Sequence, residues 1–197
     1  MSLSIACHVP GQGSCILADS LTKRGDEVSR DSAKSFRLDP CGAALFASGR
    51  FADLPGLVAG RRERSFGAAA GALWRDLAAA DLNAPDAPTQ LLMVSASRLL
   101  LRVPGFALDT DGPAIAAAGN WVQWALQFWG TPVTTDLRRL PAAGVPSTLG
   151  ACRDLMSSLA GRALAMWQTE AGYPLYETTL TPDEEVTEVR IDDPRAR

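Results

Sequence analysis

The stretch LSIACHVPGQGSCILAD, residues 3–19, decides the fold that the sequence predicts. Its first half alternates at period two, which is typical of a β-strand with one face against a core. The alternation places four apolar side chains on one face: Leu3, Ile5, Cys7 and Val9. Residues 10–13, PGQG, indicate a tight turn, because proline fixes φ and glycine accepts positive φ. Residues 14–19 then predict a returning strand, so the chain opens on a buried β-hairpin.

Beyond this hairpin, the pattern predicts strands in runs and helices in pairs. Residues 20–33 are polar and predict a loop or an irregular edge. Further strands are predicted at 33–39, 42–49, 89–97, 98–105, 113–119, 173–181 and 184–191. Helices are predicted at 51–65, 67–82, 120–130 and 147–169, the last with Ser147 as its N-cap. Grouped strands with paired helices favour antiparallel sheets covered by helices, so the expected class is α+β, a four-layer αββα sandwich.

Composition narrows the function classes. The chain has 197 residues, 47% of them hydrophobic and 21% charged, which suits one domain over residues 1–191 with a flexible tail at 192–197. Lys and Arg number 19 against 22 Asp and Glu, and this acidic balance argues against a nucleic-acid partner. No apolar run approaches the roughly 18 residues of a membrane span. The first residues do not resemble a secretory leader, so we expect a cytoplasmic protein.

Metal-ligating residues are few and scattered. The four cysteines, at positions 7, 15, 41 and 152, form no CxxC pair, and His8 is the single histidine. A zinc site needs Cys or His ligands clustered at short spacing. We therefore expect buried, reduced thiols, no metal and no cofactor.

Several short motifs, taken in order, resemble the proteasome β-type peptidases. They are a hydroxyl residue after Met1, a strand and turn, ILADS at 16–20, a lysine within AKSFRL at 33–38, and ALFASG at 44–49 followed by AD and a helix. The resemblance spans about residues 2–130 in order and continues more weakly through the last helix. It is strongest to bacterial members, namely the peptidase ring of the ATP-dependent heat-shock protease and the proteasome homologue of β-proteobacteria. It implies the N-terminal-nucleophile hydrolase fold.

The resemblance also implies a catalytic group. It assigns Ser2 as nucleophile once Met1 is removed, with Asp19 and Lys34 as partners, and it places Ser48 and Gly49 in the turn that stabilises the oxyanion. A serine hydroxyl needs a base to take its proton. The free α-amine of residue 2, with an ordinary pKa of about 7.7–8.0, can be that base.

Charged neighbours would change the pKa values of the Ser2 amine and hydroxyl. A lysine ammonium close by would lower the pKa of the amine and the hydroxyl, and Asp19 would hold the Lys34 ammonium in place. Backbone N–H groups at 48–49 suit an oxyanion, since preorganised donors stabilise developing charge. Beside that turn, Phe46 and Arg50 are candidates for lining the substrate pocket.

The implied assembly is two stacked rings of identical subunits, a tetradecamer rather than a dodecamer, with an inner chamber. A ring admits only unfolded polypeptide, which implies an ATP-dependent unfoldase as partner. In the predicted helix 120–130, Trp121, Trp124 and Phe128 share one face, which indicates a core or subunit contact.

Three other functions stay open. A catalytically weak or inactive shell that binds peptides is favoured by Ala117 and Ala118, which stand where the family often has a serine. An amidase acting on small molecules would use the same fold and nucleophile. In a generic α+β binding domain, the spacing of the three catalytic candidates would be accidental.

Overall fold

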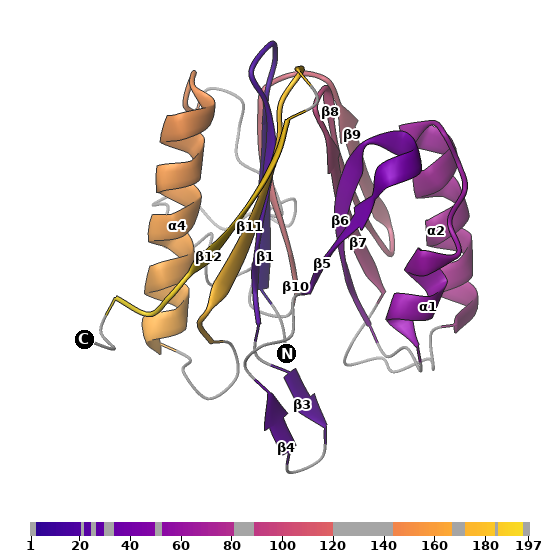
Figure 1. The fold of residues 1–197 in the computed structure, drawn as a ribbon, viewed down its shortest axis with the longest axis horizontal. Coiled ribbons are helices and arrows are strands. Elements are labelled where there is room, and N and C mark those ends of the chain that lie inside the picture. The colour runs from indigo at the N-terminus through magenta and orange to yellow at the C-terminus, as the bar shows by residue number, and fades with distance from the viewer. Residues whose placement is uncertain are drawn as a thin grey trace.

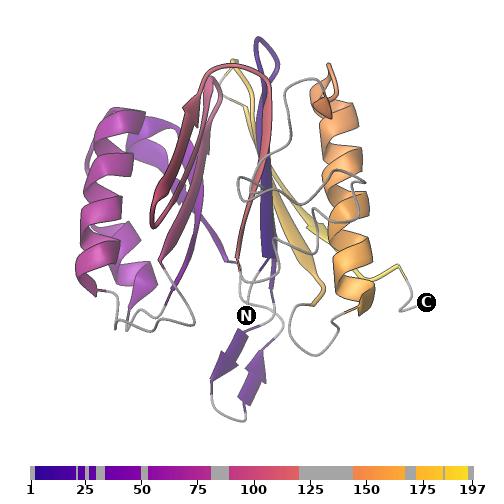
Figure 2. The same cartoon turned by 180° about the vertical axis from the view of Figure 1, so that it is seen from behind.

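The computed structural model describes residues 3–20, 22–24, 27–29, 34–49, 53–80, 89–119, 144–166, 172–183 and 185–194. Two five-stranded antiparallel sheets stack face to face, and helices cover their outer faces (Figures 1 and 2). The predicted α+β class and its order of layers, helix, sheet, sheet, helix, are confirmed. The predicted helix 120–130, with its Trp and Phe side chains, lies outside the described residues.

The first sheet is built around the opening hairpin. Its order is β10 (Ala114–Gly119), β1 (Leu3–Val9), β2 (Gly13–Asp19), β11 (Leu175–Leu180) and β12 (Val186–Ile191). The turn depends on Gly13, which has φ 115° and lies so close to β11 that a Cβ there would meet the Leu180 carbonyl oxygen at 2.2 Å. Glycine at this position therefore lets β2 lie directly against β11.

The second sheet runs in sequence order. It comprises β5 (Ser35–Leu38), β6 (Ala43–Ser48), β7 (Gln90–Ser95), β8 (Arg98–Val103) and β9 (Phe106–Thr110). Strand β9 was not predicted. Its five side chains are all partly or fully exposed, and this edge position gives it little of the apolar signal on which strand prediction depends.

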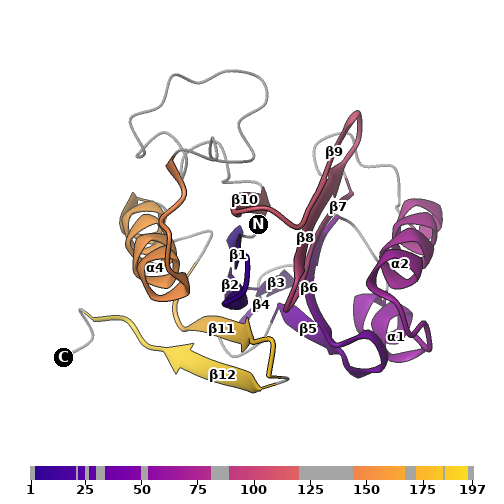
Figure 3. The same cartoon turned by 90° about the horizontal axis from the view of Figure 1, so that it is seen from above.

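Alternation along β1 explains the layers of the core. Its Leu3 face packs under α4 (Leu149–Met166), as the sequence predicts. The opposite face, represented by Ala6, is equally buried because it meets the second sheet. Helices α1 (Leu54–Ala59) and α2 (Phe66–Ala80) cover the far side of that second sheet (Figure 3). Thus both faces of each sheet are covered, which is why the central strands are apolar throughout.

The structure corrects the predicted bounds of one loop and one helix. The predicted loop at 20–33 contains a small hairpin, β3 (Thr22–Arg24) and β4 (Glu27–Ser29). Helix α1 ends at Ala59 instead of 65, because Arg61 folds back, donates to the Leu57 carbonyl and pairs with Asp76 on α2.

The start of α4 is also corrected, by one residue. Thr148, not Ser147, is the N-cap, because its Oγ1 accepts the Ala151 N–H at 3.2 Å. In the part of the chain that the structure describes, no helix is long and apolar enough to span a membrane.

Candidate functional site

A buried ion pair lies at the end of the sandwich where β1 begins. Asp19 is the last residue of β2, and Lys34 directly precedes β5. Lys34 Nζ donates to both carboxylate oxygens of Asp19, at 3.0 Å to Oδ1 and 2.9 Å to Oδ2. Asp19 is 0% exposed and Lys34 is 9% exposed. The structure therefore brings together two of the three residues assigned to catalysis, one at the end of a strand of the first sheet and one directly before a strand of the second.

The Asp19 carboxylate also holds backbone. Oδ1 accepts the Leu3 N–H at 2.8 Å. The Gly172 amide hydrogen-bonds the same carboxylate, while the Gly172 carbonyl accepts the Ser20 N–H at 3.3 Å. One buried acid thus fixes the start of β1, the ammonium of Lys34 and the segment that enters β11.

Burial and pairing act in opposite directions on this pair. Burial raises the pKa of the Asp19 carboxyl, and the Lys34 charge opposes that rise. Burial lowers the pKa of Lys34, and the Asp19 charge opposes that fall. The two-oxygen contact and the two backbone donors stabilise the ionised form of Asp19, which favours the charged pair. Lys34 therefore offers a positive charge beside the start of β1.

The proposed oxyanion turn ends β6 at the same end of the sandwich. Ser48 is the last residue of β6 and pairs with Gln90 of β7. Gly49 follows with φ 153°, a conformation that side-chain-bearing residues rarely adopt. Both residues are partly exposed.

Of the remaining predicted site residues, the structure describes only Phe46. Phe46 is 0% exposed and packs in the core between the sheets, so the expectation that it lines a substrate pocket is wrong. Its place follows from strand alternation, because Phe46 shares the inward face of β6 with Ala44. Ser2 and Arg50 lie outside the described residues.

Sequence reasoning missed one polar residue at this end. Gln90 is 3% exposed, and its side-chain Oε1 accepts the Gly119 N–H at 2.8 Å. The available signal was a lone amide at the head of an apolar strand, TQLLMVS, where a buried polar group needs a partner. Nearby, Ala117 and Ala118 are fully buried in β10 and supply no hydroxyl.

Three of the four cysteines are buried, as the sequence predicts. Cys7, Cys15 and Cys152 are buried free thiols where β1 and β2 pack against α4, and Cys41 is a partly buried free thiol. Within the described ranges no group of His, Cys, Asp or Glu has the arrangement of a metal site.

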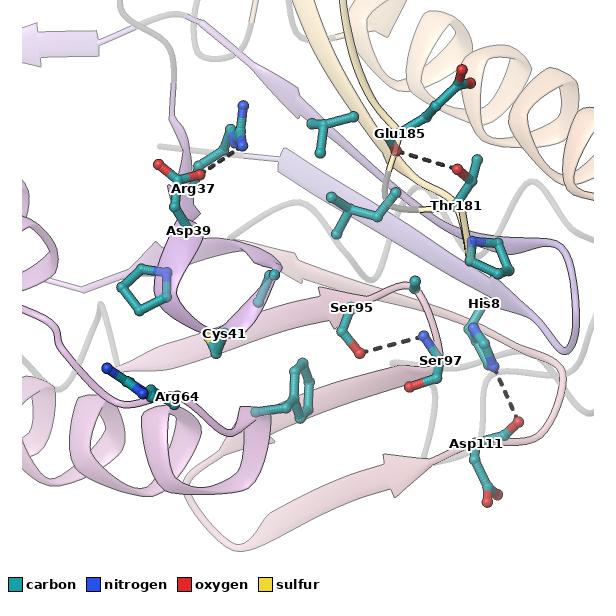
Figure 4. A pocket seen from close by; sticks show the side chains of 18 of the residues that line it. His8, Arg37, Asp39, Cys41, Arg64, Ser95, Ser97, Asp111, Thr181 and Glu185 are labelled. Carbon is teal, nitrogen blue, oxygen red and sulfur yellow. Dashed lines mark hydrogen bonds and ion pairs between the residues drawn. The ribbon is translucent and has the colours of Figure 1, made fainter.

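A cavity of about 1020 Å³ opens at the opposite end of the sandwich (Figure 4). It is bordered by the turns that follow β1, β5, β7 and β11. His8 lies at its edge with 1% exposure, donates from Nε2 to the Asp111 carbonyl at 3.1 Å, and shares a 2.9 Å hydrogen bond between Nδ1 and Ser14 Oγ. Since His8 and Leu3 lie at opposite ends of β1, the cavity is separate from the Asp19–Lys34 pair.

Comparison with known proteins identifies the fold. No family model and no curated protein sequence matches the chain. A solved structure of the (Gly-1) mutant of Anbu from Hyphomicrobium sp. strain MC1 matches with a TM-score of 0.69 and 16% identity, over 100% of this chain and 89% of that one. A structure of Anbu from the same strain matches with a TM-score of 0.66 and 18% identity, over 98% and 89%.

Anbu is a bacterial proteasome-like protein of the N-terminal-nucleophile hydrolase type. The likeness shows that this chain has the proteasome-like sandwich fold. It therefore supports the predicted resemblance at the level of fold. It does not single out the two bacterial subtypes to which the sequence motifs pointed.

Proposed function

We propose that the protein is an N-terminal-nucleophile peptidase in which Ser2, exposed by removal of Met1, attacks peptide bonds. The observation that carries this proposal is the buried Asp19–Lys34 pair with the Leu3 N–H on Asp19. Ser2 is covalently joined to that Leu3 nitrogen. An ion pair that anchors the residue after the proposed nucleophile places a fixed charge where an N-terminal catalytic group needs one.

In the proposed reaction, the Ser2 hydroxyl oxygen bonds to the carbonyl carbon while its proton moves to the α-amine of the same residue. Backbone N–H groups at Ser48 and Gly49 donate to the resulting oxyanion. Collapse of the tetrahedral intermediate breaks the C–N bond, and the amine leaves with the proton. Water then attacks the ester in the same manner and releases the acid, restoring Ser2.

Lys34 acts on this cycle through its charge. An ammonium near the α-amine and the hydroxyl disfavours their protonated states, and so lowers both pKa values. Asp19 keeps that ammonium at a fixed position. Burial of the pair strengthens the effect, because a charge acts more strongly where water is excluded.

The assembly remains part of the proposal. We infer two stacked rings of identical subunits, a tetradecamer, that take unfolded polypeptide from an ATP-dependent unfoldase in the cytoplasm. The fold supports this by its likeness to a proteasome-like protein. The closer subtype, heat-shock peptidase or β-proteobacterial homologue, rests on the sequence motifs alone.

A second candidate is a shell of the same fold that holds peptides without cutting them. The specific observation in its favour is the alanine pair at 117–118, because a β10 without a hydroxyl offers one polar group fewer to the α-amine.

Turnover of fluorogenic peptides separates the two candidates. We expect the purified protein to release the fluorophore, and Ser2→Ala to abolish release while binding the same peptide with unchanged affinity. Equal turnover by the parent chain and Ser2→Ala would contradict the peptidase. Peptide binding without turnover in either would establish the shell.

A further inference from the structure

One buried amide joins the two sheets next to the proposed site. Gln90 is the first residue of β7 in the second sheet, and Gly119 is the last residue of β10 in the first. The Gln90 Oε1 accepts the Gly119 N–H at 2.8 Å, in a buried setting. Strand β10 is at the edge of its sheet, so this bond satisfies a backbone donor by means of the facing sheet.

Each end of this bond leads to a different part of the site. On one side, Gly119 is paired with Leu3, whose N–H is held by Asp19. On the other, Gln90 is paired with Ser48, where the oxyanion turn begins. The Gln90 side chain therefore links the backbone that carries the nucleophile strand to the backbone that carries the oxyanion donors.

We propose that Gln90 is a positioning residue that fixes the separation between the start of β1 and the turn at Ser48. This inference rests on the proposed function and deepens it. Most of the packing between the sheets is apolar and non-directional, so it does not fix how far one sheet is displaced along the other, which is their offset. The Asp19–Lys34 pair also joins the two sides at this end, but through the side chains of both residues. A hydrogen bond between a fixed side chain and a strand backbone is directional, and it sets that offset next to the reacting atoms.

The opposite end of β7 supplies a matched control. There the Ser14 hydroxyl on β2 donates to the Ser95 carbonyl at 2.5 Å, again between the sheets and again buried. Gln90 and Ser95 are the first and last residues of the same strand. The two bonds are alike in burial and in the sheets they join, and differ in their distance from the proposed site. Ser14 Oγ also shares a hydrogen bond with His8 Nδ1, so removing this hydroxyl disturbs at least as many buried contacts at the far end.

The test compares Gln90→Met, Gln90→Glu and Ser14→Ala in the full chain. Methionine keeps the length of the side chain and removes the acceptor, whereas glutamate restores an acceptor oxygen. The first readout is the rate constant for covalent modification of Ser2 by a peptide epoxyketone. We expect a fall of about 10- to 100-fold in Gln90→Met, recovery to within about threefold in Gln90→Glu, and no change in Ser14→Ala.

The second readout is independent of activity. Hydrogen–deuterium exchange with single-residue fragmentation follows the amides of Gly119, Leu3 and Gly49 in the same variants. We expect Gln90→Met to speed exchange at all three and Ser14→Ala to leave them unchanged. Thermal melts of Gln90→Met and Ser14→Ala show whether these two variants lose comparable stability.

Two results would overturn the inference. One is a wild-type rate of modification by the epoxyketone in Gln90→Met, or an equal fall of that rate in Ser14→Ala, which would reduce Gln90 to a stabilising contact. The other is unchanged exchange at Leu3 and Gly49 in Gln90→Met. If the parent chain itself takes no probe, the proposed function fails, and the exchange result alone then decides whether Gln90 sets the offset.

Discussion

Lys34 places its ammonium 2.9 and 3.0 Å from the two carboxylate oxygens of Asp19, across the junction of the two sheets. These residues are 15 positions apart in sequence and are both buried. A buried ion pair is weak support for stability, because desolvation offsets the attraction. Its position next to the start of β1 therefore points to function.

Replacing Lys34 by methionine removes the charge and leaves Asp19 buried without its cation. We expect unfolding free energy to fall by about 3–5 kcal/mol and peptide turnover to fall by about 10²–10⁴-fold. Urea unfolding and the peptide assay measure the two losses. The double variant Asp19→Asn/Lys34→Met recovers most of the stability, because no buried charge is left unpaired, but does not recover turnover. Recovery of both would show that the pair is purely structural.

Variants in the turn after β6 distinguish a role of its backbone N–H groups in catalysis from a role of the Ser48 side chain. Ser48→Ala keeps every backbone N–H, so we expect turnover within about threefold of the parent chain. Gly49→Val introduces a branched side chain at φ 153°, which forces the turn to change. We expect kcat to fall by about 10²-fold with a small change in KM. A Ser48→Ala variant as impaired as Gly49→Val would mean that the hydroxyl, not the backbone, does the chemistry.

His8 makes stability dependent on pH. Burial lowers its pKa from the ordinary 6.5, and hydrogen bonds to Asp111 and Gly13 oppose the fall. The unfolded chain then binds the proton more readily than the folded one, so stability falls as pH drops below about 6.5 towards the folded pKa, and is restored as pH rises.

The measurement is urea unfolding from pH 5 to pH 7.5 in the parent chain and in His8→Gln. Charged groups on the same cavity, namely Arg37, Asp39, Arg64, Asp111 and Glu185, stay in both proteins. The difference between the two curves therefore isolates the imidazole. We expect the parent curve to fall more steeply on acidification. A steeper fall in His8→Gln would contradict the lowered pKa.

The proposed ring predicts a discrete particle mass. Native mass spectrometry of the purified chain should give a tetradecamer, 14 copies of the 20.9 kDa subunit. A dodecamer would correct the ring size and keep the enclosed chamber. A monomer at micromolar concentration would contradict self-compartmentalisation and would favour the small-molecule amidase.

The sequence predicts best those strands and helices whose apolar residues in the sequence are also the residues buried in the fold. The strands around residues 3–19 and 90–103 are apolar because both of their faces are covered, and their apolar runs lie between recognisable turns. Strand β9 was missed because an exposed edge carries no such pattern. Helix α1 was predicted too long, since nothing local shows that Arg61 would fold back onto it.

The residues of the candidate site also differ in how well the sequence predicts them. Asp19 and Lys34 could be paired from the sequence through the family motifs, although they share no local pattern. Phe46 was misplaced because an aromatic near a turn looks the same in sequence whether it faces solvent or the second sheet. Gln90 stands out in the sequence as a lone amide at the head of an apolar strand, but its partner Gly119, 29 positions away on the facing sheet, could not be predicted. The roles of Ser2 and Arg50 remain predictions.

The most direct test of the central claim is the intact mass of the purified protein before and after a peptide epoxyketone. Such a probe bonds to both the hydroxyl and the α-amine of an N-terminal nucleophile. We predict loss of the Met1 mass, followed by a single probe adduct that maps to Ser2 and is absent from Ser2→Ala. A retained Met1, or a free Ser2 terminus that never takes the probe, would contradict the N-terminal-nucleophile peptidase.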